Sequence, residues 1–440
     1  MKNFLFVSIL LLALSIQAQH TISGTFSPAD DYTWLIAYHL KPDTQVYVAD
    51  TAIKDGKFEM KIPDNSPTGT YRLVYAVPQE EFNFEILFTG KEDLELTFNN
   101  SNGLAFTRSK ENILFSTYFK EIQDAERQLI SYYSNGATDK NEFEKITSNY
   151  LAIQHSFMEM STNLVVQDFI RANRPYIPPK YETLNQYVQN RKEHYFEVLD
   201  VTNPVLQASS FLTDKLGNYV FTALPLEQLT AEETEKAMQE NLKTVVEKLE
   251  GVSDRYQFNI LYSVWSQANS SNFHNLADII YNRYLTTKAR TPENQNLVAE
   301  IELQNRLRLG GVAPDIKWKD GADLQTLSKL EGYENYVLVF WSSTCGHCLR
   351  ELPALHKRLK ENTRVKVVAI GLEDEDSIWK VEATKLEAFE HAIALGKWDS
   401  EYAALYGIES TPTYFILDKD KRIIAKPEND KEVVEFLEMK

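Results

Sequence analysis

The chain has 440 residues, of which 43% are hydrophobic and 25% are charged, and its formal net charge is −17. A chain of this length is expected to form about three domains. Because an acidic surface repels phosphate backbones, the charge argues against binding to nucleic acid. Only two cysteines are present, which is few for an exported protein, since such proteins can use disulfides freely.

Residues 1–18 have the composition of a secretory signal peptide. Lys2 is followed by an apolar run over residues 4–14, and the segment ends in small and polar side chains. An uncleaved anchor is the alternative, but this run and every other apolar stretch are shorter than the roughly 20 residues of a membrane helix. Residue 19 is a glutamine and not the cysteine that would mark a lipoprotein. We therefore expect cleavage after Ala18 and an exported, periplasmic protein with no transmembrane segment in its mature chain.

Residues 19–106 alternate between apolar and polar side chains, which is typical of half-buried β-strands. Turn-forming residues such as Asp55 and Gly56 separate the alternating segments. The pattern predicts a β-rich N-terminal domain, a small antiparallel sandwich.

Residues 107–309 change to a helical period in long segments that mix charged and apolar side chains. A proline-rich break interrupts them at residues 173–179, and no repeat indicates a solenoid. The sequence predicts a mostly α-helical central region whose aromatic residues form its core.

Gly310, Gly311 and Pro314 end the helical pattern and mark a domain boundary. Beyond it, residues 312–440 alternate apolar strands with helices, beginning with a strand over residues 336–341. This order indicates an α/β layer fold.

Both cysteines lie in one motif, Cys345-Gly346-His347-Cys348, between the first strand and a helix that we expect to start at Cys345. The N-terminus of a helix stabilises a thiolate through its free N–H groups and partial positive charge, which makes Cys345 the candidate nucleophile. Cys348 lies on the same face of the helix and is the candidate resolving thiol. A disulfide that encloses two residues would stabilise the fold little, so the placement favours redox chemistry.

Metal binding is the alternative for this motif. Zinc needs four ligands, and only Cys345, Cys348 and His347 are close in sequence. The acidic run over residues 373–376 follows a strand and is expected to form a solvated loop. We expect neither a metal nor a cofactor.

Further short motifs surround the cysteines in a fixed order. They are Ala313-Pro314-Asp315, Phe340-Trp341, Cys348-Leu349-Arg350-Glu351-Leu352-Pro353 and Tyr406-Gly407-Ile408-Glu409-Ser410-Thr411-Pro412-Thr413. With these motifs, residues 312–440 resemble the thioredoxin superfamily and, within it, the TlpA- or ResA-like exported thiol–disulfide oxidoreductases. The expected fold is thus multi-domain: an N-terminal β-sandwich, a mostly α-helical centre and a C-terminal α/β thioredoxin-like domain.

The resemblance implies roles for two more residues. It implies that the Thr411–Pro412 peptide bond is cis and faces the cysteines, so that the backbone of Thr411 can pair with an extended substrate; a trans proline is the alternative. It also implies that Glu351 is an active-site carboxylate that moves the proton of Cys348, the alternative being an exposed helical glutamate. Val339 stands where thioredoxins carry a buried aspartate, which shifts this role toward Glu351.

His347 departs from the TlpA-like pattern, which commonly has proline at this position, and makes the motif similar to that of protein disulfide isomerase. A protonated histidine near a thiolate favours the reduced pair and should raise the reduction potential. A surface histidine without a redox role is the alternative. Trp341, Gly346 and Thr411 are expected to support the site.

The leading hypothesis is thiol–disulfide exchange with exported proteins. Cys345 would attack a substrate disulfide, Cys348 would resolve it, and a membrane thiol–disulfide electron donor would restore the dithiol. Reduction and isomerisation both remain open. The alternative is an exported adaptor that uses the thioredoxin-like domain as a binding platform, since two thirds of the chain has no assigned chemistry.

Overall fold

The computed structural model describes residues 20–320 and 323–438. They form two compact units, and the division falls between Arg290 and Thr291. No helix in these described ranges has the length and apolar character of a membrane span. The predicted signal peptide, residues 1–18, lies outside the described residues.

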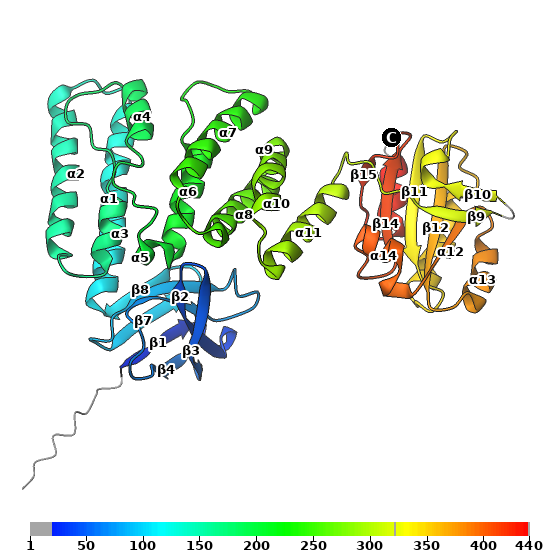
Figure 1. Ribbon diagram of the computed structural model, residues 1–440, viewed down its shortest axis with the longest axis horizontal. Coiled ribbons are helices and arrows are strands. Elements are labelled where there is room, and N and C mark those ends of the chain that lie inside the picture. The colour runs from blue at the N-terminus through cyan, green and yellow to red at the C-terminus, as the bar shows by residue number, and fades with distance from the viewer. Residues whose placement is uncertain (1–19, 321–322, 439–440) are drawn as a thin grey trace, which may run out of the picture. The chain divides into compact units, whose positions relative to one another are not determined.

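The first unit begins with two four-stranded β-sheets (Figure 1). One sheet contains, in spatial order, β4 (Lys57–Lys61), β1 (Thr21–Ser27), β7 (Leu94–Asn99) and β8 (Gly103–Arg108). The other contains β3 (Thr44–Ala52), β2 (Trp34–Lys41), β5 (Gly69–Val74) and β6 (Asn83–Phe88). Side chains such as Ile22 and Leu96 from one sheet meet Leu35 and Leu73 from the other in one buried core. The predicted β-sandwich is confirmed, although β1 and β7 pair in parallel.

Helices make up the rest of the first unit (Figure 1), as predicted. Side-chain caps explain where several begin: Asp139 caps the second helix, and Thr183 and Thr230 each complete a capping box. The helices are α1 (Lys110–Ser134), α2 (Lys140–Met160), α3 (Val166–Ala172), α4 (Leu184–Glu193), α5 (Pro204–Gln207), α6 (Ser210–Thr222), α7 (Ala231–Lys248), α8 (Asp254–Ser270), α9 (His274–Ile280), a π-helix (Tyr281–Leu285) and α10 (Thr286–Lys288).

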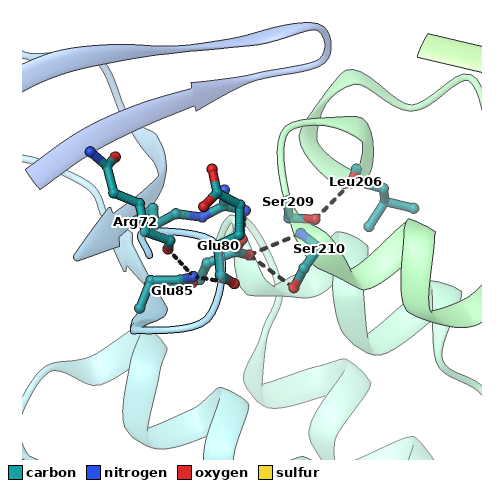
Figure 2. Close-up of polar contacts among 8 residues, drawn as sticks. Arg72, Glu80, Glu85, Leu206, Ser209 and Ser210 are labelled. Carbon is teal, nitrogen blue, oxygen red and sulfur yellow. Dashed lines mark hydrogen bonds and ion pairs between the residues drawn. The ribbon is translucent and has the colours of Figure 1, made fainter. Parts of the chain in front are cut away.

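Polar contacts join the sandwich to the helices. At the start of α6, the Glu85 carboxylate accepts hydrogen bonds from the backbone N–H and the hydroxyl of Ser210 at 3.0 and 3.2 Å, and it pairs with Arg72 at 2.8 Å (Figure 2). The buried side chain of Asn112 in α1 bonds both the N–H and the carbonyl oxygen of Leu87 in β6 at 2.7 Å. Since a buried backbone group without a partner is costly, this pairing ties the first helix to the edge of the second sheet.

The second unit is an α/β domain around a five-stranded sheet. The strands, in spatial order, are β13 (Glu390–Leu395), β12 (Val365–Glu373), β11 (Asn335–Trp341), β14 (Thr413–Asp418) and β15 (Ile423–Ala425). The first three run parallel, β14 is antiparallel to β11, and β15 is antiparallel to β14. The domain also contains α11 (Pro292–Arg306), α12 (Cys348–Leu359), α13 (Ser377–Ala383), α14 (Glu401–Tyr406), α15 (Asp430–Glu438) and the antiparallel pair β9 (Lys317–Asp320) and β10 (Asp323–Thr326). The predicted C-terminal α/β fold is confirmed.

Strand β11 lies at the centre of this sheet and is buried from Tyr336 to Trp341. Its side chains alternate between two cores, one on each face of the sheet. Tyr336, Leu338 and Phe340 join the core that includes α14, and Val337, Val339 and Trp341 join the core that includes α12 and α15. A strand buried on both faces reads as a continuous apolar run, and this one leads directly into the cysteine motif.

Candidate active site

The cysteine motif follows the end of β11 through a short turn, in which the N–H of Cys345 donates to the carbonyl oxygen of Ser342 at 3.0 Å. Helix α12 begins at Cys348, three residues later than expected. Cys345 therefore precedes the helix, and the N–H of Cys348, at the first helical position, donates to Cys345 Sγ at 3.3 Å. The helix start still points a donor at the sulfur, which is the feature that stabilises a thiolate.

The two cysteines are free thiols in different environments. Cys345 is half-buried, and although burial opposes ionisation, hydrogen bonds from Cys348 and from the backbone of His347 lower the pKa of Cys345 below its ordinary value. Cys348 is fully buried, and burial, with a further contribution from Cys345, raises its pKa to about 12. Since the thiolate is the nucleophile, the pair has one sulfur ready to attack and one held as a thiol.

The loop before β14 lies against the cysteines. The Thr411–Pro412 peptide bond is cis, as the resemblance implied, and the Cys345 thiol donates to the carbonyl oxygen of Thr411 at 3.3 Å. Both Thr411 and Pro412 are half-buried. The structure thus brings the Thr411–Pro412 bond, which lies more than 60 residues after the cysteine motif in the sequence, to Cys345.

Glu351 lies on α12, one turn after Cys348, and is half-buried. Its carboxylate accepts a hydrogen bond from the hydroxyl of Tyr414 at 3.0 Å. Tyr414, which is fully buried, was not among the predicted site residues. Burial raises the pKa of Tyr414, and the charges of Glu351 and Cys348 raise it further. The Tyr414 hydroxyl therefore lies within electrostatic reach of both the Glu351 carboxylate and the Cys348 thiol.

Glu373 contradicts the expectation of a solvated acidic loop. It is the last residue of β12, only 4% exposed, and its carboxylate accepts hydrogen bonds from the N–H of Ser343 at 2.5 Å and the hydroxyl of Ser342 at 3.3 Å. The carboxyl ends of parallel neighbours β11 and β12 meet at one edge of the sheet, which places Glu373 under the turn that carries Cys345. Sequence reasoning missed this residue because the charged run obscured where the strand ends.

The remaining predicted residues differ in exposure. Trp341 is buried, and its ring nitrogen has no hydrogen-bond partner in the described part of the chain. Gly346 and His347 are exposed, and the side chain of His347 makes no cap hydrogen bond to α12. Within the described ranges, no group of three or more His, Cys, Asp or Glu side chains is placed to hold a metal ion.

The C-terminal domain matches a known protein family. Residues 309–426 match the model of the AhpC/TSA family. The C-terminal domain is therefore an AhpC/TSA-type thioredoxin-like domain. The matched segment includes both cysteines and the Thr411–Pro412 bond.

Solved structures resemble the chain as well. A domain of a possible thiol-disulfide isomerase from Cytophaga hutchinsonii is 28% identical, with a TM-score of 0.27, and the alignment covers 30% of this chain and 92% of that one. The thioredoxin domain of a thiol-disulfide oxidoreductase from Bacteroides vulgatus is 21% identical, with a TM-score of 0.27 and coverage of 30% and 97%. A thioredoxin-like protein from Bacteroides caccae is 17% identical, with a TM-score of 0.32 and coverage of 60% and 97%. No curated protein is significantly similar to the chain.

The unequal thiols of the thioredoxin-like domain predict selective alkylation. When the reduced protein is treated with iodoacetamide at increasing pH, we expect Cys345 to react first, with a midpoint below that of an ordinary cysteine. Cys348 should stay unmodified at pH 8, where a thiol with a pKa of about 12 is ionised in about one molecule in ten thousand. Peptide mass spectrometry measures both rates. In a Cys345→Ser control, Cys348 should remain unreactive, and equal labelling of the two cysteines in the parent protein would refute the assignment.

Proposed function

We propose that the C-terminal domain exchanges disulfides with exported proteins through Cys345 and Cys348. The observation that carries this proposal is the asymmetry of the pair: Cys345 is partly accessible and has a lowered pKa, whereas Cys348 is buried and has a raised one. A nucleophile must reach its substrate and a resolving thiol must not compete with it, and this arrangement meets both needs. The export of the chain is inferred from residues 1–18, which have the composition of a signal peptide.

The exchange proceeds in two displacements. The Cys345 thiolate attacks one sulfur of a substrate disulfide, the substrate S–S bond breaks, and the other substrate sulfur leaves and takes up a proton. Cys348 then loses its proton and attacks Cys345 Sγ, which releases the second substrate thiol and leaves the pair oxidised. A thiol–disulfide donor at the membrane returns two electrons and two protons to the pair. The Thr411 carbonyl oxygen beside Cys345 is placed to accept an N–H from an extended substrate.

The second displacement needs a base, because a thiol with a pKa of about 12 does not ionise at neutral pH. Glu351 fits this role, since its hydrogen bond to Tyr414 holds the carboxylate on the side of α12 that faces β14. We propose that Glu351 accepts the proton that Cys348 loses and that Tyr414 orients the Glu351 carboxylate.

The first test is a trap for substrates. In the Cys348→Ser variant, the mixed disulfide on Cys345 cannot be resolved, so covalent complexes with exported proteins should accumulate and disappear on treatment with dithiothreitol. In the Cys345→Ser variant no complexes should form, and reduction of insulin should be lost. Non-reducing gels with mass spectrometry measure both results. Partners bound equally and non-covalently by both variants would instead support an adaptor.

The second test concerns the proton of Cys348. The Glu351→Gln variant keeps the shape of the side chain but cannot accept a proton at neutral pH, so we expect turnover in insulin reduction to fall by about a hundredfold. The fall should be smaller at high pH, where hydroxide can remove the proton, and alkylation of Cys345 should be unchanged. Glu361→Gln, an exposed change just after α12, is the control. Equal losses at all pH values would contradict the proton-transfer role.

The third test asks whether the domain reduces or isomerises substrate disulfides. The His347→Ala variant removes the imidazole but keeps the backbone N–H beside Cys345, so we expect its reduction potential to fall by about 30 mV. Equilibration with glutathione measures the potential. A parent value near the roughly −270 mV of thioredoxin would exclude the isomerase direction.

A further inference from the structure

The helical part of the first unit contains a cavity of about 90 Å³ to which the redox site gives no role. It lies among α1, α2, α4 and α6 and the segments that follow α3 and α4. Its walls include the apolar and aromatic side chains of Ile122, Tyr176 and Leu199. Polar side chains also line it, among them those of Lys215 and Tyr150.

Lys215 brings a positive charge to this cavity from α6. Its ammonium group lies 5.9 Å from the ring centre of Tyr195 and 5.8 Å from that of Phe211, and it has no hydrogen bond or ion pair with any side chain in the described ranges. Burial lowers the pKa of Lys215 to about 8, an effect that Glu126 opposes and Arg191 strengthens. A largely desolvated cation without a hydrogen-bond acceptor is costly, so an anion that binds beside Lys215 would offset this cost.

Tyr150 brings a donor to the same cavity from α2. The residue is fully buried, and its hydroxyl has no hydrogen-bond partner among the described residues. Buried hydroxyl groups in proteins almost always have a partner. The charges of Glu126 and Arg191 act on the pKa of both Tyr150 and Lys215, so the two unpaired groups flank the same ion pair.

The other charges of the cavity already have partners. Arg191 pairs with Glu126 at 2.8 Å, and Glu197 pairs with His194 at 3.3 Å and with Arg174 at 3.9 Å. One cation and one hydroxyl donor therefore remain, which is the complement of a single carboxylate group. A volume of about 90 Å³ is smaller than the roughly 150 Å³ of an engineered cavity that admits benzene, and it suits an acid with a short hydrocarbon chain.

We propose that this cavity binds a small monocarboxylic acid, whose carboxylate accepts hydrogen bonds from Lys215 and Tyr150 and whose carbon chain packs against the aromatic wall. The acid satisfies two groups that the protein leaves unpaired and places one negative charge beside one positive charge. The ligand class follows from the one cation and one hydroxyl donor that remain in the cavity. A phosphate dianion would bring a second negative charge for which no unpaired cation remains among the described lining residues.

The test uses propionate as the probe on the full chain, with its uncharged analogue propionamide at matched ionic strength. We expect saturable binding of propionate by calorimetry and none of propionamide. Lys215→Met and Tyr150→Phe should each weaken propionate binding by at least about tenfold, because each removes one donor to the carboxylate. Lys243→Met, which changes an exposed lysine on α7 that pairs with Glu240, is the matched control and should bind as the parent does.

The stability of the ligand-free variants separates binding from a structural role. Since the Tyr150 hydroxyl has no hydrogen-bond partner among the described residues and the Lys215 ammonium lies over aromatic rings, both variants should melt at or above the parent temperature without ligand and should lose the rise that propionate gives the parent. Four outcomes overturn the proposal: no saturable binding of propionate, equal binding of propionamide, preferential binding of inorganic phosphate, or parent-like affinity in the correctly folded Tyr150→Phe variant.

Discussion

Burial of β11 on both faces of its sheet is the constraint on which the cysteine site depends. Every residue from Tyr336 to Trp341 is buried, and alternate side chains enter separate cores. A one-residue slip of this strand would exchange the two cores, so its register is fixed. The turn that begins at Ser342 therefore starts at a defined point, and Glu373 of the neighbouring strand accepts its N–H and hydroxyl groups. Cys345 is thus positioned by a rigid strand and not by a free loop.

Much of this fold could be predicted from the sequence because its signals are local. Alternation indicates strands, a helical period indicates helices, and a continuous apolar run indicates a strand buried on both sides. The strand that each strand pairs with, in contrast, is not indicated by local sequence. The parallel pairing of β1 with β7 joins segments about 70 residues apart, and alternation is the same whichever neighbour a strand has. Leu303 of α11 packs on the C-terminal core. The helical period of that segment likewise does not indicate which core the helix packs against.

Prediction of the candidate active site from the sequence has the same limit. Cys345, Cys348 and Pro412 lie in contiguous motifs, so the sequence alone could propose them as site residues. Glu373 and Tyr414 were missed because their importance comes from register. Glu373 ends β12 where that strand runs beside β11, although its charged neighbours suggested a loop. Tyr414 faces Val339 across the β11–β14 pair, and only the folded sheet brings its hydroxyl to Glu351. The helix start was also placed three residues early, since the turn at Cys345 is not part of α12.

In the proposed exchange, the order of the two displacements follows from burial and from the hydrogen bond between the thiols more than from position in the motif. Both sulfurs are near the same helix start, so its partial positive charge favours both thiolates. Desolvation raises the pKa of both thiols. Hydrogen bonds more than offset it at Cys345, whereas at Cys348 the hydrogen bond with Cys345 raises the pKa further. Once Cys345 has formed a mixed disulfide, its own contribution to the raised pKa of Cys348 is removed. In the proposed exchange, attack by Cys345 therefore makes Cys348 easier to ionise, so the resolving step is favoured after the substrate is bound.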